Sequence, residues 1–156
     1  MKNFQVSRQL QGLDALIKKA ASSTQDVELL SHWARYFCVR TAGILENGIT
    51  EIYSEYVVRT SSRPVANYAS SRLAHIQNPK SQRFLETARS FDAHWAATLE
   101  SFLDDDGRKD AIDSIMNVRH QIAHGQNVSI TIARISEYLQ KAEEVLEFIE
   151  TQVRPN

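Results

Sequence analysis

Apolar residues recur every three or four positions along most of the chain, a spacing typical of amphipathic α-helices. Leu10, Leu13 and Ile17 keep this spacing and predict a first helix over roughly residues 3 to 20. No proline occurs from Val27 to Val58, where the apolar stripe continues with the same period, so a single long helix is expected there. No segment alternates apolar and polar residues over a convincing length, so the pattern does not predict a β-sheet.

Prolines, glycines and polar clusters divide the remaining chain into shorter helices. Pro64 opens one of them, and the run from Asp104 to Gly107 ends another. The expected ranges are about 64–77, 81–104 with a candidate break near Ser90, and 108–124. A last helix is expected to start from a cap among Ser129 and Thr131 and to bury apolar residues from Ile132 to Ile149. We therefore predict an all-α, antiparallel helical bundle of about five or six helices that forms a single domain over residues 1–156.

The composition agrees with a folded domain in a reducing compartment. A length of 156 residues suits one domain, and 42% hydrophobic residues with only three prolines exclude a disordered chain. Cys38 is the only cysteine, which excludes an internal disulfide and any site built from several thiolates. No stretch approaches the roughly 18 apolar residues that a membrane span requires, and no export signal is visible, so we expect a cytoplasmic protein without membrane contact.

Charge is balanced in total but unevenly distributed along the chain. Eighteen basic and 19 acidic residues give a net charge of −1, which excludes the general attraction to polyanions that strongly basic proteins use. Residues 56–85 contain no Asp or Glu, and this basic window is either a phosphate track or a solvated helix face. Its basic residues are Arg59, Arg63, Arg72, Lys80 and Arg83. The acidic stretches at 104–106 and 137–150 are expected to be solvated helix faces.

The densest group of chemically useful side chains lies at the end of the helix expected over 108–124. Arg119, His120 and His124 fall within six residues there, directly before Gly125, which is expected to end the helix. An arginine can hold a phosphate through its fixed pair of donors, and a histidine can transfer protons near neutral pH. These residue types suit cleavage of an RNA phosphodiester bond without a metal ion.

Helix geometry restricts how these three side chains can cooperate. His120 and His124 are four residues apart and share a face, whereas Arg119 and His124 are separated by about 140° around a regular helix. The arginine and this histidine can therefore reach the same atom only if the last turn is distorted or if a second copy of the helix contributes. The second option predicts a two-fold dimer whose motif helices line one cleft.

Other interpretations of the same residues stay open at this point. Arg119 and His124 can be an ordinary ion-pairing arginine and a capping histidine. His120 and His124 have the spacing of a zinc-binding pair, but zincins carry Glu where this chain has Gln121, so no metal or cofactor is expected. Arg35 and Arg40 of the long helix either pair with carboxylates such as Glu46 or reach the cleft. The aromatic residues of the helical stripes are expected in the core rather than stacked on bases: Trp33, Phe91, Trp95 and Phe102.

The string RHQIAHG resembles the signature of HEPN-domain ribonucleases, in which arginine is followed by a polar residue and, after three more positions, by histidine. The flanking segments extend this likeness over roughly residues 28–150 and are similar in particular to the RiboL-PSP branch. They are YFCVRTAGILENGITEIYSEY, SFDAHWAATLESFL and GRKDAIDSIMNVRHQIAHG.

The resemblance implies an α-helical domain that forms a homodimer with a composite active site and cuts RNA without a metal. Arg119 would orient the scissile phosphate, His124 would transfer a proton, and His120 would fill the polar position after the arginine. The products would carry 2′,3′-cyclic phosphate and 5′-hydroxyl ends. Such domains commonly act as toxins with a cognate antitoxin protein, or in defence against phage.

The charge pattern adds Arg40, Arg59, Arg63 and Arg72 as candidate substrate-binding residues. Two further classes of function stay open beside the nuclease. One is a catalytically inactive RNA-binding module, and the other is a protein-interaction module whose acidic last helix meets a partner.

Overall fold

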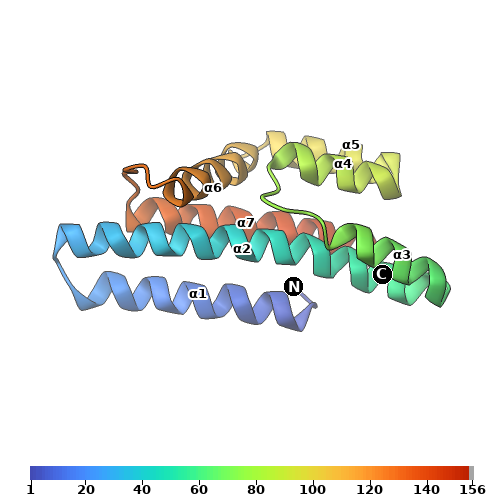
Figure 1. Ribbon diagram of the computed structural model, residues 1–156, viewed down its shortest axis with the longest axis horizontal. Helices are drawn as coiled ribbons and strands as arrows, with labels where there is room; N and C mark the ends of the chain where they lie inside the picture. The colour runs from blue at the N-terminus through green and yellow to red at the C-terminus, as the bar shows by residue number, and fades with distance from the viewer. Residues whose placement is uncertain (155–156) are drawn as a thin grey trace.

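The computed structural model describes residues 1–154, which form seven α-helices and no strands (Figure 1). The helices are α1 (Phe4–Ser23), α2 (Val27–Thr60), α3 (Arg63–Leu73), α4 (Ser81–Phe91), α5 (Ala93–Asp104), α6 (Arg108–Ala123) and α7 (Ile132–Val153). The prediction of an all-α bundle is confirmed.

Seven helices replace the expected five or six because the chain breaks at Asp92, close to the candidate break near Ser90. The backbone of Asp92 is extended, with φ −156° and ψ 127°. Its side chain accepts hydrogen bonds from the backbone N–H groups of His94 (2.7 Å) and Trp95 (3.1 Å). Asp92 is therefore both the end of α4 and the N-cap of α5.

Helix α3 ends at Leu73, four residues earlier than expected. The next residues form tighter turns, because the Ile76 N–H donates to the Leu73 carbonyl, and the Ile76 side chain is buried. Asn78 then adopts a positive φ of 48°, and its N–H donates to Glu46 Oε2 of α2 at 2.6 Å. Burial of Ile76 and this tether to α2 replace the last helical turn that the sequence pattern predicts.

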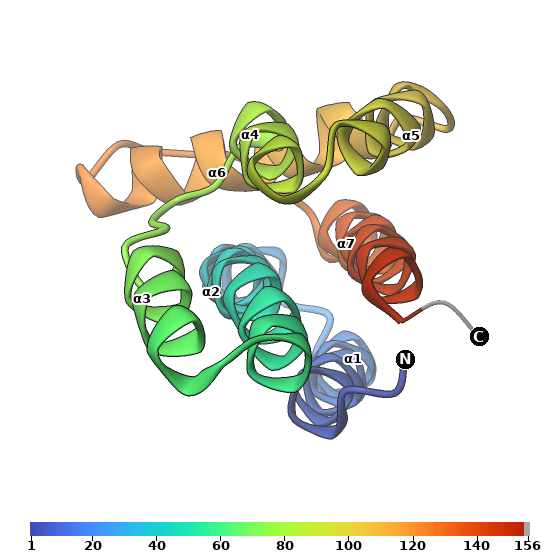
Figure 2. The same ribbon diagram turned by 90° about the vertical axis from the view of Figure 1, so that its right-hand side faces the viewer.

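Helix α2 is the centre of the molecule and packs against α1, α3, α6 and α7. One cluster of buried residues includes side chains from all seven helices. Seen along the bundle, α6 runs across the other helices, and its C-terminal end projects beyond α2 and α3 (Figure 2). No helix in the described part of the chain combines the length and the apolar character that a membrane span needs.

The close approach of α2 and α7 depends on Gly48. A Cβ atom at this position would lie 2.8 Å from Leu146 Cδ1, well inside van der Waals contact. Leu146 is itself fully buried, so its side chain fills the space that any larger residue at position 48 would need.

The expectation that Trp33 lies in the core is wrong. Its side chain is 38% exposed and stacks on the buried Phe37 ring, with the ring centroids 5.5 Å apart. Phe37 occupies the core position one turn later, and Trp33 covers it from outside. The other three aromatic residues of that expectation pack against the core: Phe91, Trp95 and Phe102.

Candidate functional site

The candidate site occupies the projecting end of α6. Ile112, Ile115 and Met116 bury one face of this helix against the bundle, which fixes its position and orientation. The last turn of α6 continues beyond the buried part and carries Arg119 and His120. Polar side chains at this end are therefore available to solvent while their backbone is held by the core.

Helix α6 ends in a hydrogen-bonded turn that requires Gly125. The Gly125 N–H donates to the Ile122 carbonyl at 3.0 Å, and the Gln126 N–H donates to the Gln121 carbonyl at 2.9 Å. These are the two bonds of a Schellman motif, with Gly125 in the left-handed region at φ 68°. The expected glycine stop is confirmed, and it places His124 at the C-cap of the helix.

His120 and His124 lie next to each other on the outer face of this helix end. Their ring centroids are 4.3 Å apart, with an angle of 61° between the ring planes. Both residues are exposed, and neither imidazole has a hydrogen-bond partner among the residues that the structure describes. Two adjacent, solvent-accessible imidazoles can donate protons to a bound ligand or accept protons from it.

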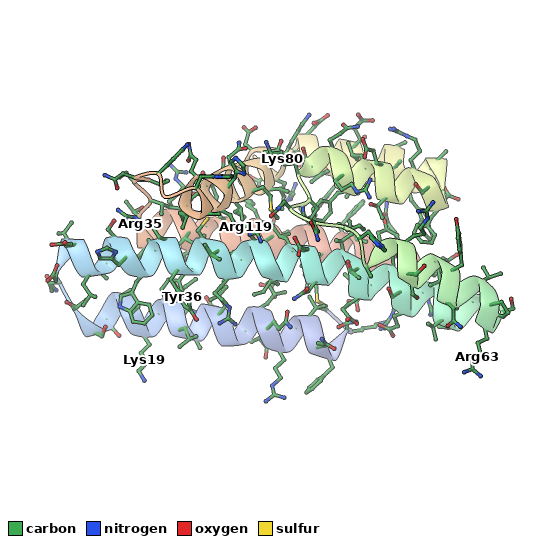
Figure 3. The ribbon with its side chains drawn as sticks, viewed as in Figure 1. Lys19, Arg35, Tyr36, Arg63, Lys80 and Arg119 are labelled. Atoms are coloured by element: carbon green, nitrogen blue, oxygen red, sulfur yellow. The ribbon has the colours of Figure 1, made fainter. Side chains whose placement is uncertain are left out.

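Arg119 points in a different direction from His124. It follows Ile112 and Ile115 by seven and four residues, so it continues the buried face of the helix toward α2 (Figure 3). The residue is partly buried, and within residues 1–154 its guanidinium has no carboxylate or carbonyl partner. An arginine in this state is available to bind an anion, which argues against its interpretation as an ordinary ion pair.

The distorted last turn that would bring Arg119 and His124 together is not observed. The His124 N–H donates to the His120 carbonyl at 3.1 Å, as in a regular helix. The two side chains therefore remain about 140° apart around the axis. Of the two arrangements considered from the sequence, the distorted turn is not observed, and the contribution of a second copy stays a prediction.

Arg35 anchors the loop that follows the motif. Its Nε donates to the Val128 carbonyl at 3.0 Å, and its Nη2 donates to Asn127 Oδ1 at 3.1 Å. The expectation of a carboxylate partner on the helix face is therefore wrong for Arg35. Its contacts fix the path of the chain directly after His124, which makes Arg35 a positioning residue.

Arg40 also pairs with a neighbour other than Glu46. Its Nη1 donates to the Tyr36 hydroxyl at 2.9 Å, and the guanidinium lies 5.8 Å from the centre of the Tyr36 ring. Both residues of this pair are exposed on α2.

The predicted substrate-binding arginines of the basic window do not gather around the motif. Arg59 donates to the Val153 carbonyl at 2.6 Å, and Arg63 lies at the far end of the molecule from Arg119 (Figure 3). Arg72 lies over the Tyr68 ring, 5.7 Å from its centre. Their contact with substrate stays a prediction, and only a ligand that extends along the molecule reaches both them and the end of α6.

Cys38 is an inert thiol rather than part of the site. It is fully buried, and its Sγ lies 3.6 Å from the Ile115 carbonyl. Burial raises the pKa of Cys38 to about 12, so the thiolate is absent near neutral pH. No group of three His, Cys, Asp or Glu side chains suited to a metal ion occurs in the described residues.

Two residues with a surface or structural role were not identified from the sequence, Tyr68 and Asp113. Tyr68 is 65% exposed, and the only sequence signal for it is Arg72 one helical turn later. Asp113 of α6 holds the start of α4 by accepting from the Ser81 N–H at 2.7 Å and from Ser81 Oγ at 2.9 Å. That contact joins residues 32 positions apart, and no local pattern predicts it.

Comparison with known proteins gives one family. The model of the RiboL-PSP-HEPN family matches residues 6–154, which include all seven helices except the first two residues of α1. No curated protein and no solved structure matches the chain. The matched range contains the whole end of α6 and its histidine pair.

Proposed function

Because the chain belongs to the RiboL-PSP-HEPN family, whose membership indicates a nuclease or RNA-related module, we propose that it is a metal-independent endoribonuclease. The observation that carries the proposal is the end of α6. There an arginine without a carboxylate partner in the described part of the chain and two exposed, adjacent histidines are held on a glycine-terminated helix. This set can bind a phosphate and move protons, which are the two requirements of RNA transesterification.

In the proposed reaction the RNA 2′-oxygen attacks the neighbouring phosphorus while its proton passes to a base. The bond between phosphorus and the 5′-oxygen breaks, and that oxygen takes a proton from an acid. The products are a 2′,3′-cyclic phosphate and a 5′-hydroxyl. Arg119 neutralises the charge on the phosphate, His124 transfers one of the two protons, and His120 is the adjacent polar group.

The active unit in this proposal is a homodimer with a composite site. A single α6 end directs Arg119 and His124 about 140° apart, so one copy does not aim both at one phosphate. Because the end of α6 projects from the bundle, a second copy related by a two-fold axis can place its own α6 end opposite (Figure 2). One cleft then contains both arginines and both pairs of histidines.

The test is cleavage of RNA by the purified protein in the presence of EDTA. We expect products that end in cyclic phosphate and 5′-hydroxyl groups, and we expect no cleavage by His124→Ala. His94→Ala is the matched control, since His94 is an exposed histidine on α5 and should remain fully active. Equal activity of the two variants would remove His124 from the mechanism, and RNA binding without cut ends would indicate an inactive binding module.

We also propose a toxin or phage-defence role in the cytoplasm, with an antitoxin protein as the partner of the toxin. This role follows from the family relationship rather than from the geometry. Expression should slow bacterial growth, and Arg119→Ala should relieve the effect at equal protein level. Growth inhibition that persists in Arg119→Ala would contradict a toxic nuclease.

A further inference from the structure

A groove of about 280 Å³ is lined by residues of α3, α4 and the segment between them. Helices α3 and α4 lie away from the C-terminal end of α6 (Figure 1). Its floor is apolar and consists of Leu73, Ile76 and Phe91. Tyr68 and Arg72 form the wall on α3, and Arg83 stands on the α4 side. The groove therefore combines an apolar floor with one exposed aromatic ring and two guanidinium groups.

The groove is a built feature of the fold. Helix α3 packs on α2, whereas α4 packs on α5 and α6, so the two walls are held by different neighbours. The segment that joins them is fixed at both ends, by the Asn78 N–H on Glu46 and by Ser81 on Asp113. The walls are thus pre-positioned, so the protein loses little conformational entropy when a ligand binds.

The charges of the groove favour an anionic ligand. Arg72 lies 5.7 Å from the centre of the Tyr68 ring and has no carboxylate partner among the described residues. Within residues 1–154 Arg83 forms an ion pair only with Glu86, at 3.5 Å. Both side chains are about half exposed, so this pair contributes little to stability and leaves Arg83 accessible to a ligand. One carboxylate therefore faces two guanidinium groups. Lys80, at the N-cap of α4, adds an exposed positive charge at the start of that helix.

We propose that this groove binds single-stranded RNA as a second contact site, one that is separate from the cleavage site. A base would lie on the apolar floor against the Tyr68 ring, and Arg72 and Arg83 would bind the adjacent phosphates. The inference rests on the proposed function in that RNA is the ligand. It adds a specificity for length, because an RNA held at the end of α6 must extend as far as α3 and α4 to reach the groove.

The binding test uses a fluorescently labelled, single-stranded 2′-O-methyl oligonucleotide. This probe lacks the nucleophilic hydroxyl, so affinity from fluorescence anisotropy is measured without cleavage. We expect Tyr68→Ala and Arg72→Ala each to weaken binding by about tenfold, in the range of a lost base stack or phosphate contact. Tyr68→Phe should keep most of the affinity, because it retains the ring.

Arg72→Ala should also reduce the slope of log affinity against log salt by about 0.7, the value for one phosphate contact on a single strand. Arg89→Ala is the matched control, since Arg89 is an exposed arginine of α4 outside the groove. Unchanged affinity in Tyr68→Ala and Arg72→Ala would overturn the proposal. An equal loss in Arg89→Ala would also overturn it, because the attraction would then be general rather than local.

A cleavage series separates this inference from the proposed function. Groove variants should raise KM for long RNA and leave the cleavage of short oligonucleotides unchanged, whereas His124→Ala should abolish both. Normal cleavage by the groove variants at every RNA length would support the proposed nuclease and contradict RNA binding in the groove. If the groove variants bind the probe more weakly but the unmodified protein cuts no RNA, RNA binding in the groove is supported and the proposed nuclease is contradicted.

Discussion

The angle between Arg119 and His124 predicts that each RNA phosphate is cut by residues from two copies of the chain. Five residues of regular helix separate the two side chains by about 140° and about 7.5 Å along the axis. The hydrogen bond from the His124 N–H to the His120 carbonyl shows that the helix stays regular up to that point. Mixing a variant that lacks only Arg119 with a variant that lacks only His124 should therefore restore RNA cleavage.

The expected size of this rescue follows from counting copies. Arg119→Ala and His124→Ala should each be inactive alone, because loss of a phosphate-binding or proton-transfer group costs about 10²–10⁴ in rate. If the subunits exchange freely, about half of the dimers in an equal mixture contain one copy of each variant. Each mixed dimer keeps one of its two composite arginine and histidine pairs, so about one quarter of the normal activity should return.

The assay is the initial rate of RNA cleavage after the two variants are mixed and allowed to exchange subunits. Size-exclusion chromatography with light scattering should first show that each variant still forms dimers. A mixture that remains as inactive as the separate variants would refute the reasoning. Arg119 and His124 of the same copy would then act together, in spite of their angular separation in α6.

Three further predictions concern the fold and the chemistry of single side chains. Gly48→Ala should lower the free energy of unfolding by about 1 kcal/mol, because overpacking against Leu146 outweighs the gain in helix propensity. Gly43→Ala should raise the free energy of unfolding by about 1 kcal/mol, because a Cβ atom there meets no neighbour within 4 Å. Urea denaturation measures both changes. Cys38 should not react with Ellman's reagent at pH 8 until the protein is unfolded, because burial raises the pKa of its thiol to about 12. Burial, ahead of the nearby carboxylates, also raises the pKa of Glu143, so its charged form destabilises the fold above that pKa. Glu143→Gln should therefore raise Tm at pH 7, and the difference should disappear below the unfolded-state pKa of about 4.3.

The helices could be predicted because their signals are local. Apolar residues at helical spacing, together with Pro64 and Gly125, mark most helix boundaries within a few residues. The boundaries that differ depend on contacts between distant segments. Helix α3 ends early because Ile76 is buried and because Asn78 binds Glu46, 32 positions away along the chain.

The same distinction applies to the candidate site. The group of Arg119, His120 and His124 is visible in the sequence because its members lie on one helix. The role of Arg35 is not, because its partner Val128 is 93 positions away and offers only a backbone carbonyl. The groove around Tyr68 could not be predicted from the sequence for a similar reason. Its two walls come from separate helices, and the spacing of these helices is set by α2 and α6.

The acidic residues of α7 show how such contacts change the meaning of a charge count. Glu147 binds the N-terminal ammonium group at 2.8 Å, and Glu144 binds Arg108 at 2.8 Å. Glu150 is buried and accepts hydrogen bonds from the backbone N–H groups of Lys2 and Asn3. These carboxylates hold the fold together, so the expectation of a solvated acidic face is wrong for this part of α7, and a surface for a basic partner is correspondingly reduced.

The basic residues proposed to bind RNA differ from these carboxylates in their charge pairing. Arg72 and Arg119 have no carboxylate partner among residues 1–154, while several acidic side chains pair with basic groups of the same chain. A net charge of −1 therefore understates the attraction that a phosphate meets at the end of α6 or in the groove. Because this attraction is local, the proposed function predicts selection of RNA that follows one path along the surface, without the general affinity for polyanions that a strongly basic protein shows.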